Sequence, residues 1–270
     1  MKLAYFPGCK IDFYLKVYDI TFKSIFEKFS VELVELPFNC CGYPARDNDY
    51  EVSLFSSIRN LAIAGEYNLD VITPCKCCYG QLQYASLQTK HLEKNQEGKK
   101  LKQKFKNLLA KENLSFNENS RIKHLISFLY HDIGIQEIKK RIKKRLPEKR
   151  VVTQYGCHAL RPSSVTEFDN PHAPRIFEEL INITGYKSVE WSKSTECCGH
   201  PVLERNQSLS LKILDSKLDA AKEAKADYIC TACTHCQIQY SELPLQKNCE
   251  KPTVTPLLFT QILDNALKLN

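Results

Sequence analysis

Ten of the thirteen cysteines in this 270-residue chain follow one pattern that occurs twice. Each copy has a single cysteine, then an adjacent pair followed by glycine, then a Cys-x-x-Cys motif. The first copy consists of Cys9, Cys40, Cys41, Cys75 and Cys78, and the second of Cys157, Cys197, Cys198, Cys233 and Cys236. A repeat of this kind is typical of a duplicated structural unit. Since thiolates bind zinc and iron–sulfur centres, the pattern predicts one metal centre in each half.

The number of sulfurs narrows the choice of metal. Structural zinc closes at four ligands, and an ordinary cubane cluster is held by four cysteines. Neighbouring side chains on a strand point to opposite faces, so each adjacent pair must lie in a turn, for which Gly42 and Gly199 supply the freedom. Two explanations fit five thiolates: an iron–sulfur cluster with an extra thiolate, or four ligands plus one reactive thiol. Zinc sites or vicinal disulfides account less well for the whole pattern.

The other cysteines and the ends of the sequence indicate a compartment. Cys77, Cys230 and Cys249 have no counterpart in the other copy, and we interpret them as buried thiols that pack like small apolar side chains. A short apolar run after Met1 is broken early, which predicts no secretory signal. So many thiols without a signal predict a reducing, cytoplasmic environment. No apolar run is long enough for a transmembrane helix, and peripheral attachment at the inner face of the membrane stays open.

Short apolar runs alternate with amphipathic stretches in each half, which predicts an α/β fold with mainly parallel sheets. We expect strands at residues 2–6, 31–36 and 71–73 in the first half and at 151–155, 188–191 and 228–231 in the second. We expect helices at 12–29, at 50–67, from Tyr79 onward, and at 172–183, 207–224 and 257–269. The helix at 12–29 has an aromatic stripe that we expect to pack in the core: Tyr14, Tyr18, Phe22, Phe26 and Phe29.

The predicted strands place the sulfurs. Cys9, Cys75, Cys157 and Cys233 each follow the carboxyl end of a predicted strand. Loops at these ends gather at one edge of a parallel sheet, which is the usual ligand crevice. Three loops in each half can therefore bring five sulfurs together although they lie far apart in the sequence.

A basic segment separates the two halves. We divide the chain into a first half at 1–90, a basic helical connector at 91–150 and a second half at 151–270. Residues 90–150 hold 18 Lys or Arg against 7 Asp or Glu, with the densest run at 139–145. A solvated helix face explains this charge, and contact with acidic proteins or anionic lipids is the alternative. No nucleic-acid motif accompanies the charge, so we expect no nucleic-acid partner.

At these residues the chain resembles the CCG-domain family, named for its Cys-Cys-Gly signature, and within it the B subunits of heterodisulfide reductases. The likeness covers nearly the whole chain and includes the segments 155–162 and 169–171. It implies two pseudo-symmetric CCG half-domains whose ten cysteines ligate two non-cubane [4Fe–4S] clusters across a cleft. It also implies reduction of a heterodisulfide, with electrons from two partner proteins of the same complex, a ferredoxin-like iron–sulfur C subunit and a flavin-containing A subunit.

One departure limits the resemblance. Methanogen-type members follow the second Cys-Cys-Gly with a glycine-rich stretch, whereas this chain has His200 and Pro201 there. The identity of the disulfide therefore does not carry over. Relatives with the doubled motif also serve as quinone-reducing, membrane-docking subunits of unusual succinate dehydrogenases or fumarate reductases, which is the alternative function.

Several polar side chains lie beside the expected ligands. His158 and His200 are the candidate catalytic proton donors, because each stands next to a cysteine motif. Lys76, Tyr79 and His235 lie inside or beside the two Cys-x-x-Cys motifs. We expect these three to tune the cluster sulfurs or to pack against them.

Overall fold

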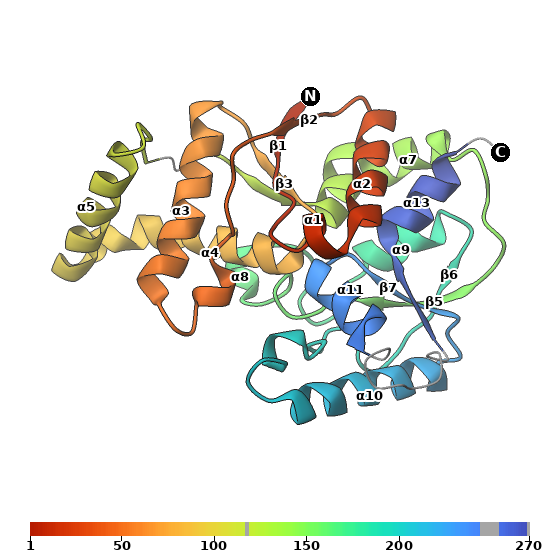
Figure 1. The fold of residues 1–270 in the computed structure, drawn as a ribbon. Coiled ribbons are helices and arrows are strands. Elements are labelled where there is room, and N and C mark those ends of the chain that lie inside the picture. The colour runs from red at the N-terminus through yellow and green to blue at the C-terminus, as the bar shows by residue number, and fades with distance from the viewer. Residues whose placement is uncertain (117–118, 244–253, 269–270) are drawn as a thin grey trace.

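Two parallel sheets with identical strand order form the framework of the protein (Figure 1). The computed structural model describes residues 1–116, 119–243 and 254–268. The first sheet has the order β2-β1-β3-β4 and the second β6-β5-β7-β8, with every pairing parallel. The strands are β1 Lys2–Tyr5, β2 Glu32–Glu35, β3 Val71–Thr73, β4 Ile122–His124, β5 Arg150–Gln154, β6 Lys187–Ser188, β7 Tyr228–Thr231 and β8 Thr255–Leu258. The predicted fold class, two α/β halves of like topology, is confirmed.

Helices connect the strands and cover the sheets. In the first half they are α1 Ile11–Tyr14, α2 Lys16–Lys28, α3 Tyr50–Glu66, α4 Lys76–His91, α5 Gln96–Ala110, α6 Leu125–Ser127 and α7 Ile135–Arg141, with a π-helical segment at Phe128–Gly134. In the second half they are α8 Ser163–Thr166, α9 Ile176–Asn182, α10 Gln207–Glu223, α11 Thr234–Ser241 and α13 Phe259–Leu267. Equivalent helices begin alike: Asp49 caps α3 and Asn206 caps α10, each accepting from the third backbone N–H that follows.

Four expectations about elements were wrong in detail. The connector, expected to be helical, contains β4, which pairs with β3 at the edge of the first sheet. The segment expected to begin the last helix contains β8, where Pro256 is tolerated because the strand lies at an edge. Helix α4 begins at Lys76, three residues before Tyr79. The helix expected at 12–29 breaks at Leu15, and Tyr14 is 55% exposed, unlike the rest of the aromatic stripe.

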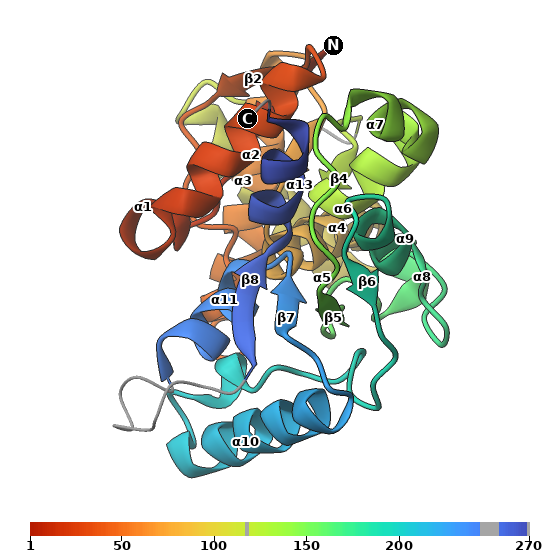
Figure 2. The ribbon, with the colours of Figure 1, turned by 90° about the vertical axis from the view of Figure 1, so that its right-hand side faces the viewer.

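The two halves pack through helices that they exchange reciprocally. Helix α13, which follows the last strand of the second sheet, packs on α2 of the first half (Figure 2). Helix α6, which follows the last strand of the first sheet, packs on α9 of the second half. A single apolar core runs through both sheets and these helices.

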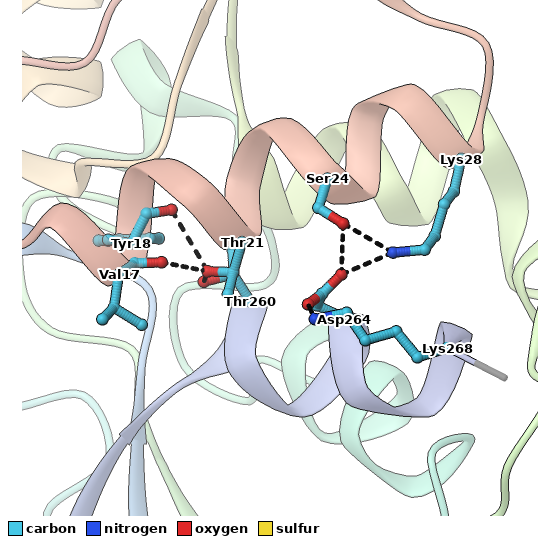
Figure 3. A network of polar contacts seen from close by, with 8 residues as sticks. All are labelled: Val17, Tyr18, Thr21, Ser24, Lys28, Thr260, Asp264 and Lys268. Atoms are coloured by element: carbon cyan, nitrogen blue, oxygen red, sulfur yellow. Dashed lines mark hydrogen bonds and ion pairs between the residues drawn. The ribbon is translucent and has the colours of Figure 1, made fainter. Parts of the chain in front are cut away.

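Polar contacts also join α2 to α13 (Figure 3). Asp264 on α13 is 2% exposed; it accepts from Ser24 at 2.6 Å and from the Lys28 ammonium at 2.7 Å. The hydroxyls of Thr21 and Thr260 hydrogen-bond at 2.7 Å. The interface between the halves is therefore both apolar and specifically hydrogen-bonded.

Candidate functional site

Both Cys-Cys-Gly turns lie beyond the carboxyl ends of the strands and have the same backbone geometry. Gly42 has a φ of 87° and Gly199 a φ of 92°, which lie in the left-handed region. Each glycine starts a short 3-10 turn, at Tyr43–Ala45 and at His200–Val202. The turn that the sequence predicted for each adjacent pair is therefore present.

The five cysteines of the first set lie in contact in sequence-distant pairs. The sulfurs of Cys9 and Cys40 are 3.9 Å apart. Cys41 hydrogen-bonds to Cys40 and to Cys78, and Cys78 also hydrogen-bonds to Cys75. Cys9 is exposed and Cys40 half-buried, whereas the other three are buried. The set thus runs from the surface into the core.

The second set is arranged in the same way. All five of its cysteines line one cavity: Cys157, Cys197, Cys198, Cys233 and Cys236. Here too the single cysteine and the first member of the adjacent pair are half-buried, and the remaining three are buried. The backbone N–H of Gly199 donates to the Cys197 sulfur at 3.4 Å. This cavity with its sulfur lining is the shape expected of a site that encloses a metal centre.

The two sets meet in the interior. The ligand atoms of Cys75, Cys77, Cys233 and His235 all lie within 4.8 Å of one another, and all four residues are buried. Thr234 donates to the Cys75 sulfur from the other half at 3.1 Å. The ten repeated cysteines therefore form one continuous series, with its middle at Cys75 and Cys233.

Hydrogen bonds between the thiols favour a thiolate at the same place in each set. Donation by Cys41 and Cys9 lowers the pKa of Cys40 to about 2. Donation by Cys157 and Cys198 lowers the pKa of Cys197 to about 2. The first cysteine of each adjacent pair is therefore ready to act as an anionic ligand.

Both Cys-x-x-Cys motifs occupy the N-terminal end of a helix. Cys75 precedes α4 and Cys233 precedes α11, and the second cysteine of each motif lies in the first turn. The free N–H groups and the dipole of a helix start stabilise nearby negative charge. Both helices therefore help to hold deprotonated sulfurs.

A cleft of about 200 Å³ opens between the halves in front of these sulfurs. Its lining includes Cys9, Tyr43 and Arg46 from the first half and His200 and His235 from the second. The Arg205 guanidinium spans its mouth, 3.2 Å from a carboxylate oxygen of Asp47. A substrate of modest size can therefore reach the first set from solvent.

The structure separates the two candidate proton donors. His158 lies in the second cavity, with its Nδ1 3.2 Å from the Cys157 sulfur. His200 lines the cleft and packs edge-on against His235, with ring centroids 4.7 Å apart. Burial lowers the pKa of both, to about 4 for His200, so both rings are neutral at pH 7.

His235 differs from these two rings. Burial acts to lower its pKa, but hydrogen bonds with Cys233 and Cys75 raise it to about 10. The sequence placed His235 only beside a motif, and its position against both sets was not predicted. The signal available was its place inside Cys-x-x-Cys, where it corresponds to Cys77 of the first half.

The other side chains marked in the sequence have structural partners. Lys76 is buried and donates to the Gln154 backbone oxygen of the other half at 2.8 Å. The Tyr79 hydroxyl donates to the Thr166 backbone oxygen. Cys230 is buried in β7, as expected, and Cys249 lies outside the described residues. Cys77 is buried too, but it touches both sets rather than apolar side chains alone.

The donor set fits an iron–sulfur group. The twelve cysteines of the described residues are all free thiols, and ten of them converge as two groups of five. Soft sulfur donors of this number suit iron–sulfur clusters better than a tetrahedral ion. Across the parts of the chain that the structure describes, no helix has the length and apolar character to cross a membrane.

Comparisons with known proteins agree with this arrangement. Residues 3–83 and 151–241 match the CCG family model, described as a cysteine-rich domain. The chain is 28% identical to the B subunit of the ferredoxin/F(420)H(2)-dependent CoB-CoM heterodisulfide reductase of Methanosarcina acetivorans, over 98% of this chain and 89% of the relative. It is 30% identical to a protein of Archaeoglobus profundus described as like the B subunit of heterodisulfide reductase, over 90% and 81%.

Two further matches widen the picture. The chain is 28% identical to the "8-methylmenaquinol:fumarate reductase membrane anchor subunit" of Wolinella succinogenes, over 98% of this chain and 92% of the relative. A crystal structure of a hypothetical protein from Helicobacter pylori matches the whole chain with a TM-score of 0.73 at 16% identity, a likeness of fold. This chain spans 49% of that protein's length. By its two matched segments and their cysteines, the chain belongs to the CCG cysteine-rich domain family and carries the domain twice.

Proposed function

We propose that this chain is the disulfide-reducing iron–sulfur B subunit of a heterodisulfide reductase-like complex. The observation that supports it is the convergence of ten cysteines as two groups of five behind one cleft. The ten would hold two non-cubane [4Fe–4S] clusters, one in each half. When bound, such clusters supply single electrons and iron sites that hold thiolate sulfur.

The reaction consumes two electrons and two protons for each disulfide that becomes two thiols. The cleft would bind the disulfide near Cys9, where the first set reaches the surface. His200 in the cleft and His158 in the second cavity are our candidates for proton delivery. As neutral rings they would pass on a proton from solvent rather than hold one.

The electrons would come from partner proteins. We propose a ferredoxin-like iron–sulfur C subunit and a flavin-containing A subunit, in a complex located in the cytoplasm. The names of the two Methanosarcina relatives support this assignment, because both describe the B subunit of an enzyme that uses ferredoxin.

Metal analysis tests the proposal. Anaerobically purified protein is expected to contain about eight irons per chain, with a matching amount of acid-labile sulfide and an EPR signal on reduction. Cys41→Ser removes a ligand of the first set and should lower the iron content by about half. Cys230→Ser, which changes a buried cysteine outside both sets, should leave it unchanged. Zinc in place of iron would contradict the proposal.

A quinone-reducing, membrane-docking role is the second candidate. Phe13, Tyr14, Val17 and Ile20, which follow Cys9 in the sequence, are 79%, 55%, 50% and 64% exposed. Such a surface suits contact with lipid, and the Wolinella relative is named a membrane anchor. Flotation with anionic liposomes tests it: salt-sensitive binding by the wild type that Phe13→Ser weakens would favour this role.

A further inference from the structure

The first turn of α4 reaches out of its own half. Cys77 belongs to the first half, yet it lines the cavity that all five cysteines of the second set line. Its sulfur is 3.7 Å from Nδ1 of His158 and within 4.8 Å of the Cys233 sulfur. Cys77 is only 4% exposed. The second site is therefore completed by a sixth sulfur from the opposite half.

Backbone packing holds Cys77 in this place. A Cβ atom on Gly80 would lie 2.5 Å from the backbone oxygen of His158, so α4 and the loop after β5 touch without room for a side chain. Lys76 fixes the same turn through its bond to the Gln154 backbone oxygen. The position of Cys77 thus follows from how the halves dock and does not depend on the chemistry of its sulfur.

The second half returns a different group. In the aligned Cys-x-x-Cys motifs, His235 stands where the first half has Cys77. His235 is 8% exposed, lies within 4.8 Å of the Cys75 sulfur and lines the cleft with Cys9. Its Nδ1 has no hydrogen-bond partner among the described residues. The exchange is therefore unequal: a thiol goes one way and an imidazole the other.

We propose that Cys77 is a positioning residue of the second half's centre, to which it donates an S–H hydrogen bond, and that His235 does the same for the first. This inference rests on the proposed function. Hydrogen bonds to the sulfurs of an iron–sulfur centre stabilise its reduced form and raise its potential. A second buried charge beside several thiolates is costly, so the neutral thiol is the favoured form of Cys77. Two centres with like ligands would then hold unlike potentials.

Redox titration of the full chain, followed by EPR, tests the inference. Cys9→Ser and Cys157→Ser assign each signal to one half, since each removes a ligand of one set. Cys77→Ala is expected to lower the midpoint potential of the second centre alone. Cys77→Ser keeps a donor and should stay near the wild type. His235→Ala should lower the potential of the first centre alone, and Cys230→Ala, the matched buried cysteine, should change neither.

Other outcomes would overturn the inference. A shift of the first centre by Cys77→Ala, an equal shift by the alanine and serine variants, or no shift would each do so. Loss of iron from Cys77→Ser would also do so, because it would make Cys77 a ligand. If Cys77→Ala does not fold, Cys77→Val fills the volume without donating and gives the same comparison. Wild-type protein without iron would instead contradict the proposed function itself.

Discussion

The two Cys-Cys-Gly turns depend on their glycines for both conformation and space. Gly42 has a positive φ, and a Cβ atom there would lie 2.2 Å from the Ser53 backbone oxygen. Gly199 is less crowded, with the equivalent contact to Ser210 at 3.0 Å. A third glycine separates these two effects, because Gly134 has the same φ of 87° as Gly42 but nothing within 4 Å of its Cβ position.

We therefore expect Gly42→Ala to cost more than Gly134→Ala. Both variants carry the penalty of left-handed backbone, about 1 kcal/mol. Gly42→Ala adds a collision with backbone that cannot move away freely, about 2 kcal/mol more. It should also reduce the iron held by the first set. Denaturant unfolding and iron analysis measure both effects, and equal losses in the two variants would show that the collision is relieved.

Helices α2 and α13 form the polar contact between the halves. Burial acts to raise the pKa of Asp264, but hydrogen bonds from Lys268, Lys28 and Ser24 outweigh it and hold the pKa below its ordinary value. The Lys28 ammonium is 28% exposed and its partner carboxylate 3%, so this pair is shielded from solvent. Lys268 is 59% exposed and adds little.

Asp264→Asn should destabilise the protein by about 2 kcal/mol at neutral pH, the size of a charge-assisted hydrogen bond. A carboxylate with a lowered pKa contributes stability above the ordinary aspartate pKa of about 4, and this is lost as the pH falls through the folded-state pKa. The difference between wild type and variant should therefore shrink on acidification. Denaturant unfolding at several pH values measures it, with Lys268→Met as the control of small effect. A difference that does not change with pH would contradict the pairing.

The sequence predicted six of the eight strands in the described residues. It missed β4, because three residues are too few to show a period, and β8, because Pro256 argues against a strand. The convergence of sulfurs was predictable because strand ends locate loops. The crossing of Cys77 and His235 was not, since it depends on how two halves dock, which no local pattern records. The division of the chain at 90 and 150 stays a prediction.

At the scale of the whole molecule, the halves share one core. Buried side chains of both sheets belong to the same apolar cluster, and the sulfur series crosses between them. Elements that share a core open together when the free energy of their separation exceeds that of local unfolding.

We therefore expect one cooperative unit. Asp264→Asn, a change at the interface, should lower the protection of β1 and β3 and of β5 and β7 by equal amounts of free energy. Hydrogen exchange with peptide-level mass spectrometry reads all four strands in one experiment. A loss confined to one pair of strands would show that the halves open separately. Arg59→Gln, at an ion pair within the first half, is the control away from the interface.

The reciprocal packing of α13 on α2 and of α6 on α9 has a historical consequence. Each contact joins a helix that follows the last strand of one half to a helix near the start of the other, which is the self-complementary pattern of a twofold dimer. A polypeptide with only one copy could cover these faces by pairing with an identical molecule. The present chain is thus what gene fusion makes of a homodimer, and fusion allowed the once-identical partners to diverge at the cysteine and histidine beside their shared axis.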